Sequence, residues 1–454
     1  MPTSQYKTRT VFNTLWSMAT LFHLTARGEW PTPLLQGLLA AAALYLLCRP
    51  SAAPRLLLLA AIQLCESWTT APFISNHWLF TGLINLTIVL AYARLAWIHR
   101  TPSVDPDTFY RSFAPVVRLE LIILYFFVVF HKLNTDFFNP LTSCAGHFYL
   151  AQIQRFPLLS SLPIGENSPI YFTLIIEAAI PLLLCLRPTR QAGILLGLVF
   201  HAAISFNPIS GFYNFSSMLF ALFFLFSSFD LESTSFSKLA SPLRRWQGLS
   251  FRHQSLLAIL AMLGALIALS ALSNILETTN DLVLFLWALY CIALFTGTVL
   301  LPKTTPERGL FSPIPGFLLL MPLLTILNGA SPYLGLKTET AFAMYSNLRT
   351  EGERSNHLLV PQAVQLFDFQ QNLVEIKDSS SGFLKNLAQR RLLLPFFEVR
   401  AFLNSHPNTT LTYLRHAPPG APPDDQLRQP IPWPLRKLLY FRPVALGGPQ
   451  PCSH

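Results

Sequence analysis

The HKLNTD segment (residues 131–136) groups a histidine, a lysine and an aspartate at the end of a long apolar run. Ionisable side chains at such a boundary lose hydration, which is costly, and they are therefore candidates for function. A lysine in a poorly solvated pocket has a lowered pKa, so the neutral amine of Lys132 can accept a proton from a weak acid such as a phenol or hydroquinone. His131 and Asp136 would tune that amine in opposite directions. The alternative is that Lys132 only extends to the lipid headgroups.

Polar residues in four other apolar runs are expected at a similar depth in the fold. Asn76-His77 opens one of these runs, and His201 lies near the end of another. Their convergence would create one polar pocket, in which Lys132, His77, Asn76 and His201 are the candidate catalytic residues. Each of them also has an ordinary alternative role, such as an interfacial histidine or a histidine bonded to a backbone carbonyl. Further residues expected at or beneath the pocket are His23, Glu66, Asn85 and Glu177.

Neither the histidines nor the cysteines have the spacing of a metal site. His77, His131, His147 and His201 are numerous enough, but no pair has the i, i+3 or i, i+4 spacing of helical ligands. The six cysteines include no CxxC pair and are scattered inside or beside apolar runs. The sequence therefore predicts no metal ligand, no zinc site and no disulfide framework.

The composition is that of a polytopic membrane protein. Of 454 residues, 52% are hydrophobic and 12% are charged, whereas soluble chains carry about a quarter charged residues. Several apolar runs of about 17–22 residues are long enough to cross a hydrocarbon core of roughly 30 Å. The expected fold is an all-α polytopic membrane bundle of about 9–11 transmembrane helices, with a small C-terminal exoplasmic α/β or β-containing region. The expected spans are 11–27, 33–48, 55–72, 77–98, 115–131, 169–186, 190–207, 211–229, 254–273, 281–301 and 312–328.

Lysine and arginine are unevenly distributed between the loops on the two sides of these spans. Fifteen, including Arg111 and Arg118, fall in one set of short loops and three in the other. The positive-inside rule places the richer set in the cytoplasm. We therefore expect a multi-pass protein of the inner (cytoplasmic) membrane, with a cytoplasmic N-terminus and an exoplasmic C-terminus. The net charge of +10 then reflects orientation in the lipid bilayer, and no nucleic-acid partner is expected.

Composition divides the chain into three segments. Residues 1–329 are expected to form the transmembrane domain, and 330–415 a water-compatible exoplasmic region. Residues 416–454 form a proline-rich tail, which we expect to be extended rather than packed. Within the exoplasmic region, Leu366–Lys377 indicates strand structure, whereas Arg390–Leu403 is compatible with helix or strand.

The same residues carry a resemblance to a known family. Val129–Phe137 is similar to the Lys-Lys-Leu-Asp-Ala-Asp-Trp segment of vitamin K-dependent γ-glutamyl carboxylases and of the related bacterial horizontally transferred transmembrane domain. Three further segments resemble the family's Asn-His motif, its later Phe-His block and the opening of its exoplasmic portion. They are, in that order, Ser75–Phe80, Phe200-His201 with Phe212 and Ser217-Met218, and Ala343–Leu348 with Asn356-His357.

The resemblance implies a reaction and a role for each matched residue. Lys132 matches the base that deprotonates vitamin K hydroquinone or menaquinol. Addition of O2 then gives a strong base that removes a γ-proton from a protein glutamate, and the carbanion takes up CO2. Asn76 and His77 match residues that steady the quinone oxygens or the carbanion, and His201 belongs to the later block. The cofactor-binding segment comprises His131, Asn134 and Asp136.

The sequence also departs from the family pattern. His131, Asn134 and Phe137 replace a lysine, an aspartate and a tryptophan, and the short exoplasmic portion argues against propeptide recognition of the animal kind. Because one fold can host several functions, two alternatives to a carboxylase with an exoplasmic protein substrate stay open. One is a lipid- or quinone-binding membrane protein that performs no carboxylation. The other is a transporter with Glu177 and Asn85 on a polar path, although no repeated half supports it.

Overall fold

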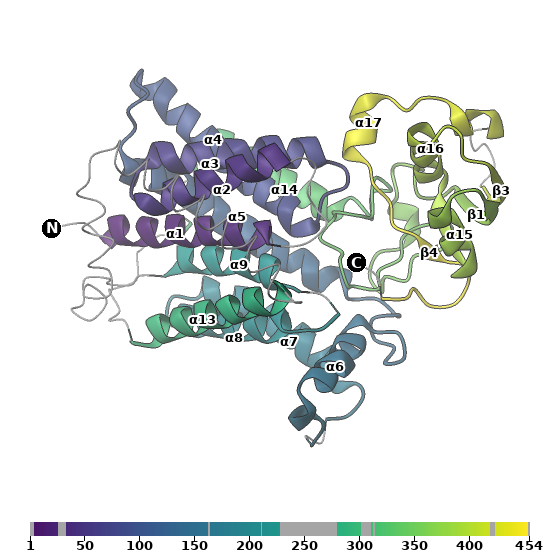
Figure 1. Cartoon of the computed structure of the whole chain (residues 1–454), viewed down its shortest axis with the longest axis horizontal. Coiled ribbons are helices and arrows are strands. Elements are labelled where there is room, and N and C mark those ends of the chain that lie inside the picture. Colours follow the sequence, from purple (N-terminus) through teal and green to yellow (C-terminus); the bar gives the residue numbers. More distant parts are fainter. Residues whose placement is uncertain are drawn as a thin grey trace. The chain divides into compact units, whose positions relative to one another are not determined.

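The computed structural model describes residues 4–25, 33–161, 164–209, 211–227, 279–300, 310–311, 314–417 and 423–452. The chain is mostly helical (63%) and has a small antiparallel sheet near its C-terminal end (Figure 1). The expected span at 254–273 lies outside the described residues.

Each of the other ten expected spans coincides with a helix, and the largest differences are at the N-terminal ends of α5 and α14. The short helix α6 was not expected as a span. The helices of this part of the chain are α1 (Ser4–Leu24), α2 (Pro33–Cys48), α3 (Ala53–Thr70), α4 (Asn76–His99), α5 (Pro106–His131), α6 (Cys144–Arg155), α7 (Ser168–Cys185), α8 (Arg190–Ser205), α9 (Tyr213–Phe223), α13 (Thr279–Leu300) and α14 (Leu320–Ala330).

Within the described ranges, four helices are long and apolar enough to cross a membrane. They are α4, α5, α7 and the part of α13 from Leu282 to Val299. The 26 residues of α5 make a helix of about 39 Å, which exceeds the roughly 30 Å of a hydrocarbon core. Shorter apolar helical segments lie at Leu34–Cys48, Arg190–Ser205, Tyr213–Phe226 and Gly316–Ala330. The long apolar helices and the small sheet agree with the expected helical membrane bundle and its C-terminal region.

Helix α5 begins nine residues before the expected span. Its first turns are polar, so hydropathy does not indicate them, and hydrogen bonds stabilise them. Asp105 Oδ2 accepts hydrogen bonds from the amide and the hydroxyl of Thr108, both at 2.8 Å, and so caps the helix. These hydrogen bonds lower the pKa of Asp105. Arg118, expected in a loop, is instead buried within α5. Its guanidinium donates to the carbonyls of Leu225 (2.8 Å) and Leu310 (2.9 Å). These hydrogen bonds compensate for the burial of the charge, whereas hydropathy alone predicts an arginine in water.

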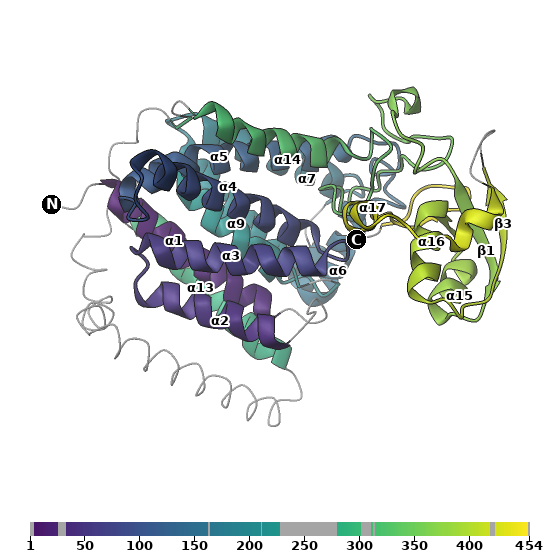
Figure 2. The ribbon, with the colours of Figure 1, turned by 90° about the horizontal axis from the view of Figure 1, so that it is seen from above.

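One compact unit comprises Met1–Thr69, Phe80–Ile122 and Ala179–Pro322. Within this unit α1 packs against α2 and α9 (Figure 2). Helix α8 packs against α9 and α13.

A chain of buried hydrogen bonds connects three helices of this unit. Trp16 Nε1 donates to Asn85 Oδ1 (3.2 Å), Asn85 Nδ2 donates to Gln63 Oε1 (2.7 Å), and Gln63 Nε2 donates to Thr20 Oγ1 (2.7 Å). Polar side chains inside an apolar bundle require such partners. Asn85, expected at the bottom of the polar pocket, has both atoms of its amide engaged in this network.

The second compact unit comprises Thr70–Leu79, Ile123–Ala178 and Leu323–His454. It contains an antiparallel sheet of strand order β3-β1-β2-β4, with helices α15 and α16 packed against β1 and β2. The bounds are β1 (Leu373–Ser379), α15 (Gly382–Gln389), β2 (Leu392–Pro395), α16 (Phe396–Ser405), β3 (Leu411–His416), α17 (Trp433–Leu438) and β4 (Val444–Ala445).

The two faces of this sheet follow the two-residue period of a strand. Val374 and Ile376 of β1 and Leu394 of β2 lie in the core that α15 and α16 cover. Leu373 and Leu393 point to the opposite face and pack with Val444. The expected strand at Leu366–Lys377 thus begins later, at residue 373, and Arg390–Leu403 contains both a strand and a helix.

The C-terminal segment is packed, which corrects the expectation of an extended tail. Val444 pairs with Leu393 in the sheet, Phe441 is fully buried, and Cys452 forms a disulfide with Cys144. This disulfide also corrects the expectation from cysteine spacing, because the partners lie 308 residues apart and leave no local signal. The two compact units therefore divide the chain differently from the three segments that composition indicated.

Candidate functional site

Lys132 forms a buried ion pair with Glu177, within the second compact unit. The residue follows the last turn of α5, and its Nζ lies 2.8 Å from Glu177 Oε1 and 2.6 Å from Oε2 on α7. The side chains are only 7% and 11% exposed. The ring of Phe137 lies 5.9 Å from the ammonium nitrogen and adds an aromatic wall. Lys132 is therefore held inside the protein and does not extend to the headgroups.

Such a pair is sensitive to the loss of either partner. Removing two charges from water costs several kcal/mol per ion, and their attraction offsets this only while both are present. A carboxylate and an ammonium at 2.6 Å can also exchange one proton along their hydrogen bond, which leaves a neutral acid and a neutral amine. Chemically, the pair can thus hold a proton at one atom or the other without changing its net charge.

His131 is fully buried beside the pair, and both of its ring nitrogens have partners. Nε2 lies 3.0 Å from the carbonyl oxygen of Ala341, and Nδ1 lies 2.8 Å from the hydroxyl of Tyr333. A carbonyl only accepts, so Nε2 carries the proton, and in a neutral ring Nδ1 accepts from Tyr333. Burial raises the pKa of Tyr333, which keeps its hydroxyl a donor. These contacts fix the backbone from which Lys132 extends.

Asn134 hydrogen-bonds to backbone groups of the turn that follows α5. Its Nδ2 donates to the carbonyls of His131 (2.8 Å) and Ser346 (2.7 Å). Its Oδ1 accepts from the amides of Asp136 (3.1 Å) and Phe137 (2.8 Å). Every one of these bonds is made within the protein, so Asn134 acts here as a structural centre of the HKLNTD segment.

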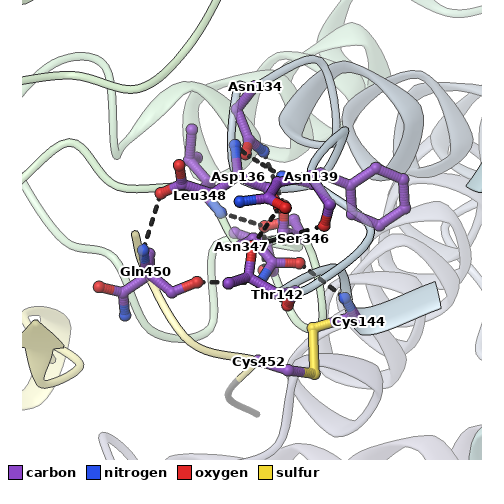
Figure 3. The surroundings of a disulfide bond; sticks show 12 residues. Asn134, Asp136, Asn139, Thr142, Cys144, Ser346, Asn347, Leu348, Gln450 and Cys452 are labelled. Atoms are coloured by element: carbon purple, nitrogen blue, oxygen red, sulfur yellow. Dashed lines mark hydrogen bonds between the residues drawn. A yellow bond between two sulfur atoms is a disulfide. The ribbon is translucent and has the colours of Figure 1, made fainter. Parts of the chain in front are cut away.

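Asp136 connects the same turn to two distant parts of the chain. Its Oδ2 accepts from Asn356 Nδ2 (2.8 Å) and from the amide of Gln450 (2.7 Å). Figure 3 shows this carboxylate between Asn134 and Gln450. The carboxylate therefore joins the HKLNTD segment to the C-terminal segment.

The Cys144–Cys452 disulfide lies beside this network (Figure 3). Asn347 Oδ1 accepts from the amide of Cys144 (2.9 Å), and its Nδ2 donates to the carbonyls of Thr142 (2.9 Å) and Gln450 (3.0 Å). The disulfide and the hydrogen bonds of Asn347 thus hold the start of α6 and the C-terminal segment together.

The segment Thr340–Asn347 has an unusual backbone where it meets this site. Thr340, Phe342, Tyr345 and Asn347 all have φ between 55° and 63°. For residues other than glycine, this conformation costs roughly 1–2 kcal/mol each. Such strain persists only where surrounding contacts determine the conformation, and it is common at functional sites.

Asn76 and His77 belong to the same compact unit as Lys132. Asn76 Oδ1 accepts from the amide of Phe342 at 2.6 Å, while its Nδ2 has no acceptor among the described residues. Nε2 of His77 lies 3.4 Å from Ser75 Oγ, and both residues are buried. Asn76 thus contacts Phe342, and His131 contacts the neighbouring Ala341.

His201 lies in the other compact unit, on α8. Its ring contacts those of Phe200, Phe215 and Phe223, with centroids 5.1–5.9 Å apart, and its carbonyl accepts from Ser205 and Ser216. His23 and Glu66 are also buried in that unit. The predicted meeting of these residues with Lys132 stays a prediction.

The sequence left the partners of the site largely unidentified. Glu177 was expected only beneath the pocket, and its isolated position in an apolar run was the available signal. Tyr333 carried no signal, because a tyrosine at the end of a helix is ordinary. The contacts of Ala341 and Ser346 are made by backbone carbonyls, which no residue type reveals.

Comparisons of this chain with protein-family models, with curated proteins and with solved structures find no match.

Proposed function

We propose that this chain is a polytopic, carboxylase-like membrane protein in which Lys132 accepts a proton from a lipophilic hydroquinone such as reduced vitamin K or menaquinol. The observation that carries the proposal is the buried Lys132–Glu177 pair. The sequence resemblance supplies the remaining chemistry, in which hydroquinone oxygenation is coupled to carboxylation of glutamate in an exoplasmic protein, with O2 and CO2 as co-substrates.

The Lys132–Glu177 pair is suited to this proton transfer because it combines an amine with a carboxyl group. When one proton moves from Lys132 to Glu177, the low-polarity surroundings favour the resulting neutral pair more than water would. The neutral amine can then take a phenolic proton and become an ammonium. That ammonium compensates the negative charge left on the substrate. Reduced quinone, when bound, supplies the electrons for the oxygenation.

The neighbouring residues support the amine in different ways. The Asn76 amide nitrogen is a donor for a substrate oxygen, and His77 is proposed as a further contact. His131, Asn134 and Asp136, expected to bind the cofactor, are better suited to positioning because their polar atoms already bind the protein.

The proposed site faces the exoplasmic side of the inner membrane, and the N-terminus faces the cytoplasm. Two observations support this orientation. Lysine and arginine are concentrated in alternate loops, and Cys144 and Cys452 form a disulfide, which is typical of an oxidising compartment.

Quinone epoxide formation tests the catalytic proposal. The purified full-length protein in lipid nanodiscs would be supplied with vitamin K hydroquinone or menaquinol, O2, CO2 and a glutamate-containing peptide. We expect epoxide from the wild-type protein, a loss of at least about 100-fold in Lys132→Ala, as for removal of a general base, and no change in the exposed control Lys385→Ala. The same absence of product from wild type and Lys132→Ala, while a known carboxylase is active in parallel, would overturn the proposal.

A quinone- or lipid-binding protein without catalysis is the second candidate. It is favoured by the strength of the Lys132–Glu177 contact, since a lysine fully neutralised by its partner can serve structure alone. Quinone fluorescence quenching would distinguish the two. Equal quinone affinity in wild type and Lys132→Ala, with no product from either protein, supports binding without turnover.

A further inference from the structure

A cavity of about 790 Å³ lies within the second compact unit. Its walls are the loop 349–358, one face of the sheet and the loop 446–448. Leu373 and Leu393 form an apolar floor, on the sheet face opposite the α15 and α16 core. This volume falls in the range of small-molecule sites, and an apolar surface with a few polar groups is their usual lining.

Two arginines give the cavity a positive character. Arg349 is held by hydrogen bonds from NH1 to the Ala445 carbonyl (2.9 Å) and from Nε to the Glu351 carbonyl (3.4 Å). Burial lowers the pKa of Arg349; the charges of Glu351 and Asp136 oppose this effect, and that of Arg354 adds to it. Arg354 is exposed at the cavity and has no ion pair within the described part of the chain. The two guanidinium groups therefore repel each other, and a bound anion would relieve that repulsion.

The acidic groups nearby already have partners or face solvent. Glu351 binds the buried Arg442 at 3.3 Å, and Asp136 accepts from Asn356 and Gln450. On the cavity wall itself, Glu353 is exposed. His416, also on the wall, lies 3.3 Å from Glu375. Arg354 thus lines the cavity as a cation without an ion pair among the described residues.

The loop 446–448 presents open backbone to the cavity. Gly447 and Gly448 have φ of 75° and 74°, and a Cβ built on either would meet no atom within 4 Å. The amides of these glycines have no acceptor among the described residues. The loop is positioned by the amide of Leu446, which donates to the Arg391 carbonyl (2.9 Å). Both glycines line the cavity beside the arginines, so a ligand oxygen there can approach two backbone donors, as at other anion-binding turns.

The cavity also borders the HKLNTD segment. Thr135 and His357 both line it, and the ring of His357 is fixed in a neutral form. Its Nδ1 accepts from the amides of Leu359 (3.1 Å) and Val360 (3.0 Å), so Nε2 donates to the Phe130 carbonyl (2.9 Å). Burial lowers the pKa of His357, which favours this neutral state. A ligand in the cavity would contact His357, which is hydrogen-bonded to the backbone of Phe130, and Thr135, which lies three residues after Lys132.

We propose that this cavity is a binding site for a small organic anion, whose phosphate or carboxylate group is held by Arg349, Arg354 and the Gly447-Gly448 amides while its apolar part rests on Leu373 and Leu393. The arginine fork matches the oxygens of both groups. The site is separate from the proposed chemistry at Lys132 and does not depend on it. The anionic group has two sources, a soluble molecule or the headgroup of an anionic phospholipid.

Calorimetric titration of the full-length protein in phosphatidylcholine nanodiscs tests the site. The probes are inorganic phosphate and glutarate, each added to wild type, Arg354→Gln, Arg349→Lys and the exposed control Arg390→Gln. We expect saturable binding of at least one probe, weakened at least about tenfold in Arg354→Gln, the loss expected for one charge-assisted pair. Arg390→Gln is expected to bind as wild type does.

Nanodiscs containing phosphatidylglycerol distinguish the two sources. If the ligand is a headgroup, phosphatidylglycerol competes with the soluble probe, so the apparent probe affinity of wild type is weaker in these discs and that of Arg354→Gln is unchanged. If the ligand is a soluble molecule, wild type binds the probe equally well in both lipids. If Arg354→Gln binds the probe as tightly as wild type and has the same melting temperature, the proposed site is wrong. It is also wrong if wild type shows no saturable probe binding in phosphatidylcholine discs and retains no more phosphatidylglycerol than Arg354→Gln does.

Discussion

At the scale of single residues, Lys132 and Glu177 each bury a charge that the other neutralises. The pair joins the end of α5 to α7 over 45 residues of sequence. His131 and Asn134 hold the adjoining backbone through hydrogen bonds to Tyr333, Ala341 and Ser346. This division of roles predicts that the pair determines both local stability and any proton transfer, while its neighbours determine geometry.

Two variants test whether the charges of the pair compensate each other inside the protein. Glu177→Gln leaves the Lys132 charge buried and uncompensated, so we expect a destabilisation of about 3–5 kcal/mol. Lys132→Met combined with Glu177→Met removes both charges and should recover most of that loss. Chemical denaturation of the protein in detergent measures both. If Glu177→Gln is as stable as wild type, the pair is not buried as described.

At the scale of elements, the loop after α14 and helix α16 bring two carboxyl groups into one half-buried region. Burial, assisted by the charge of Glu351 and opposed by that of Arg442, raises the pKa of Glu339 on the loop to about 7. Burial likewise raises the pKa of Glu398 on α16 to about 7, with Glu339 acting in the same direction. The amide of Phe441 donates to Glu398 at 3.2 Å and connects this region to the C-terminal segment.

These raised pKa values predict a pH dependence of stability. In the unfolded chain both carboxyls titrate near 4.5. Between pH 4.5 and 7 the folded state therefore binds more protons than the unfolded state, and stability falls as the pH rises through this window. When melting temperatures are measured from pH 5 to 7.5, Glu339→Gln should therefore show a slope less negative than that of wild type, because it removes one of these two groups. The exposed control Glu353→Gln should keep the wild-type slope, and a Glu339→Gln slope equal to that of wild type would contradict the assignment.

At the scale of the whole molecule, one covalent bond joins regions that are 308 residues apart in the chain. The Cys144–Cys452 disulfide attaches the C-terminal segment beside the network of Asp136 and Asn347. Together with the sheet pairing of Val444, it makes the end of the chain part of the second compact unit.

Removing the disulfide should loosen this unit. Cys452→Ser is expected to destabilise the protein by roughly 2–5 kcal/mol and to expose a reactive thiol at Cys144. A membrane-impermeant maleimide should label Cys144 in spheroplasts of this variant, because we propose that this side faces the periplasm. Cys48→Ser, which removes a free cysteine, serves as the control. Labelling of Cys144 in unreduced wild-type protein would contradict the bond, and labelling only after lysis would contradict the orientation.

The positions of the helices were predictable because hydrophobicity is a local property of the sequence. Ten expected spans coincide with helices, and the strand and helix near residues 373–405 were partly expected. The start of α5 was not, because its first turns are polar and are capped by Asp105. The burial of Arg118 was not expected either, because the carbonyls that stabilise it lie more than 100 residues away in sequence. The candidate site was identified only as a set of residue types at the end of an apolar run.

By itself, therefore, the sequence determined that this is a helical chain with apolar membrane-length segments and an unusual lysine at the boundary of one of them. Apolar runs and their lengths follow from solvation, which acts on each segment separately. Only the tertiary structure decided that Lys132 is paired with Glu177, that His131 contacts Tyr333 across 202 residues, and that Cys452 is bonded to Cys144. Each of these contacts depends on the relative placement of distant segments, which no local pattern encodes.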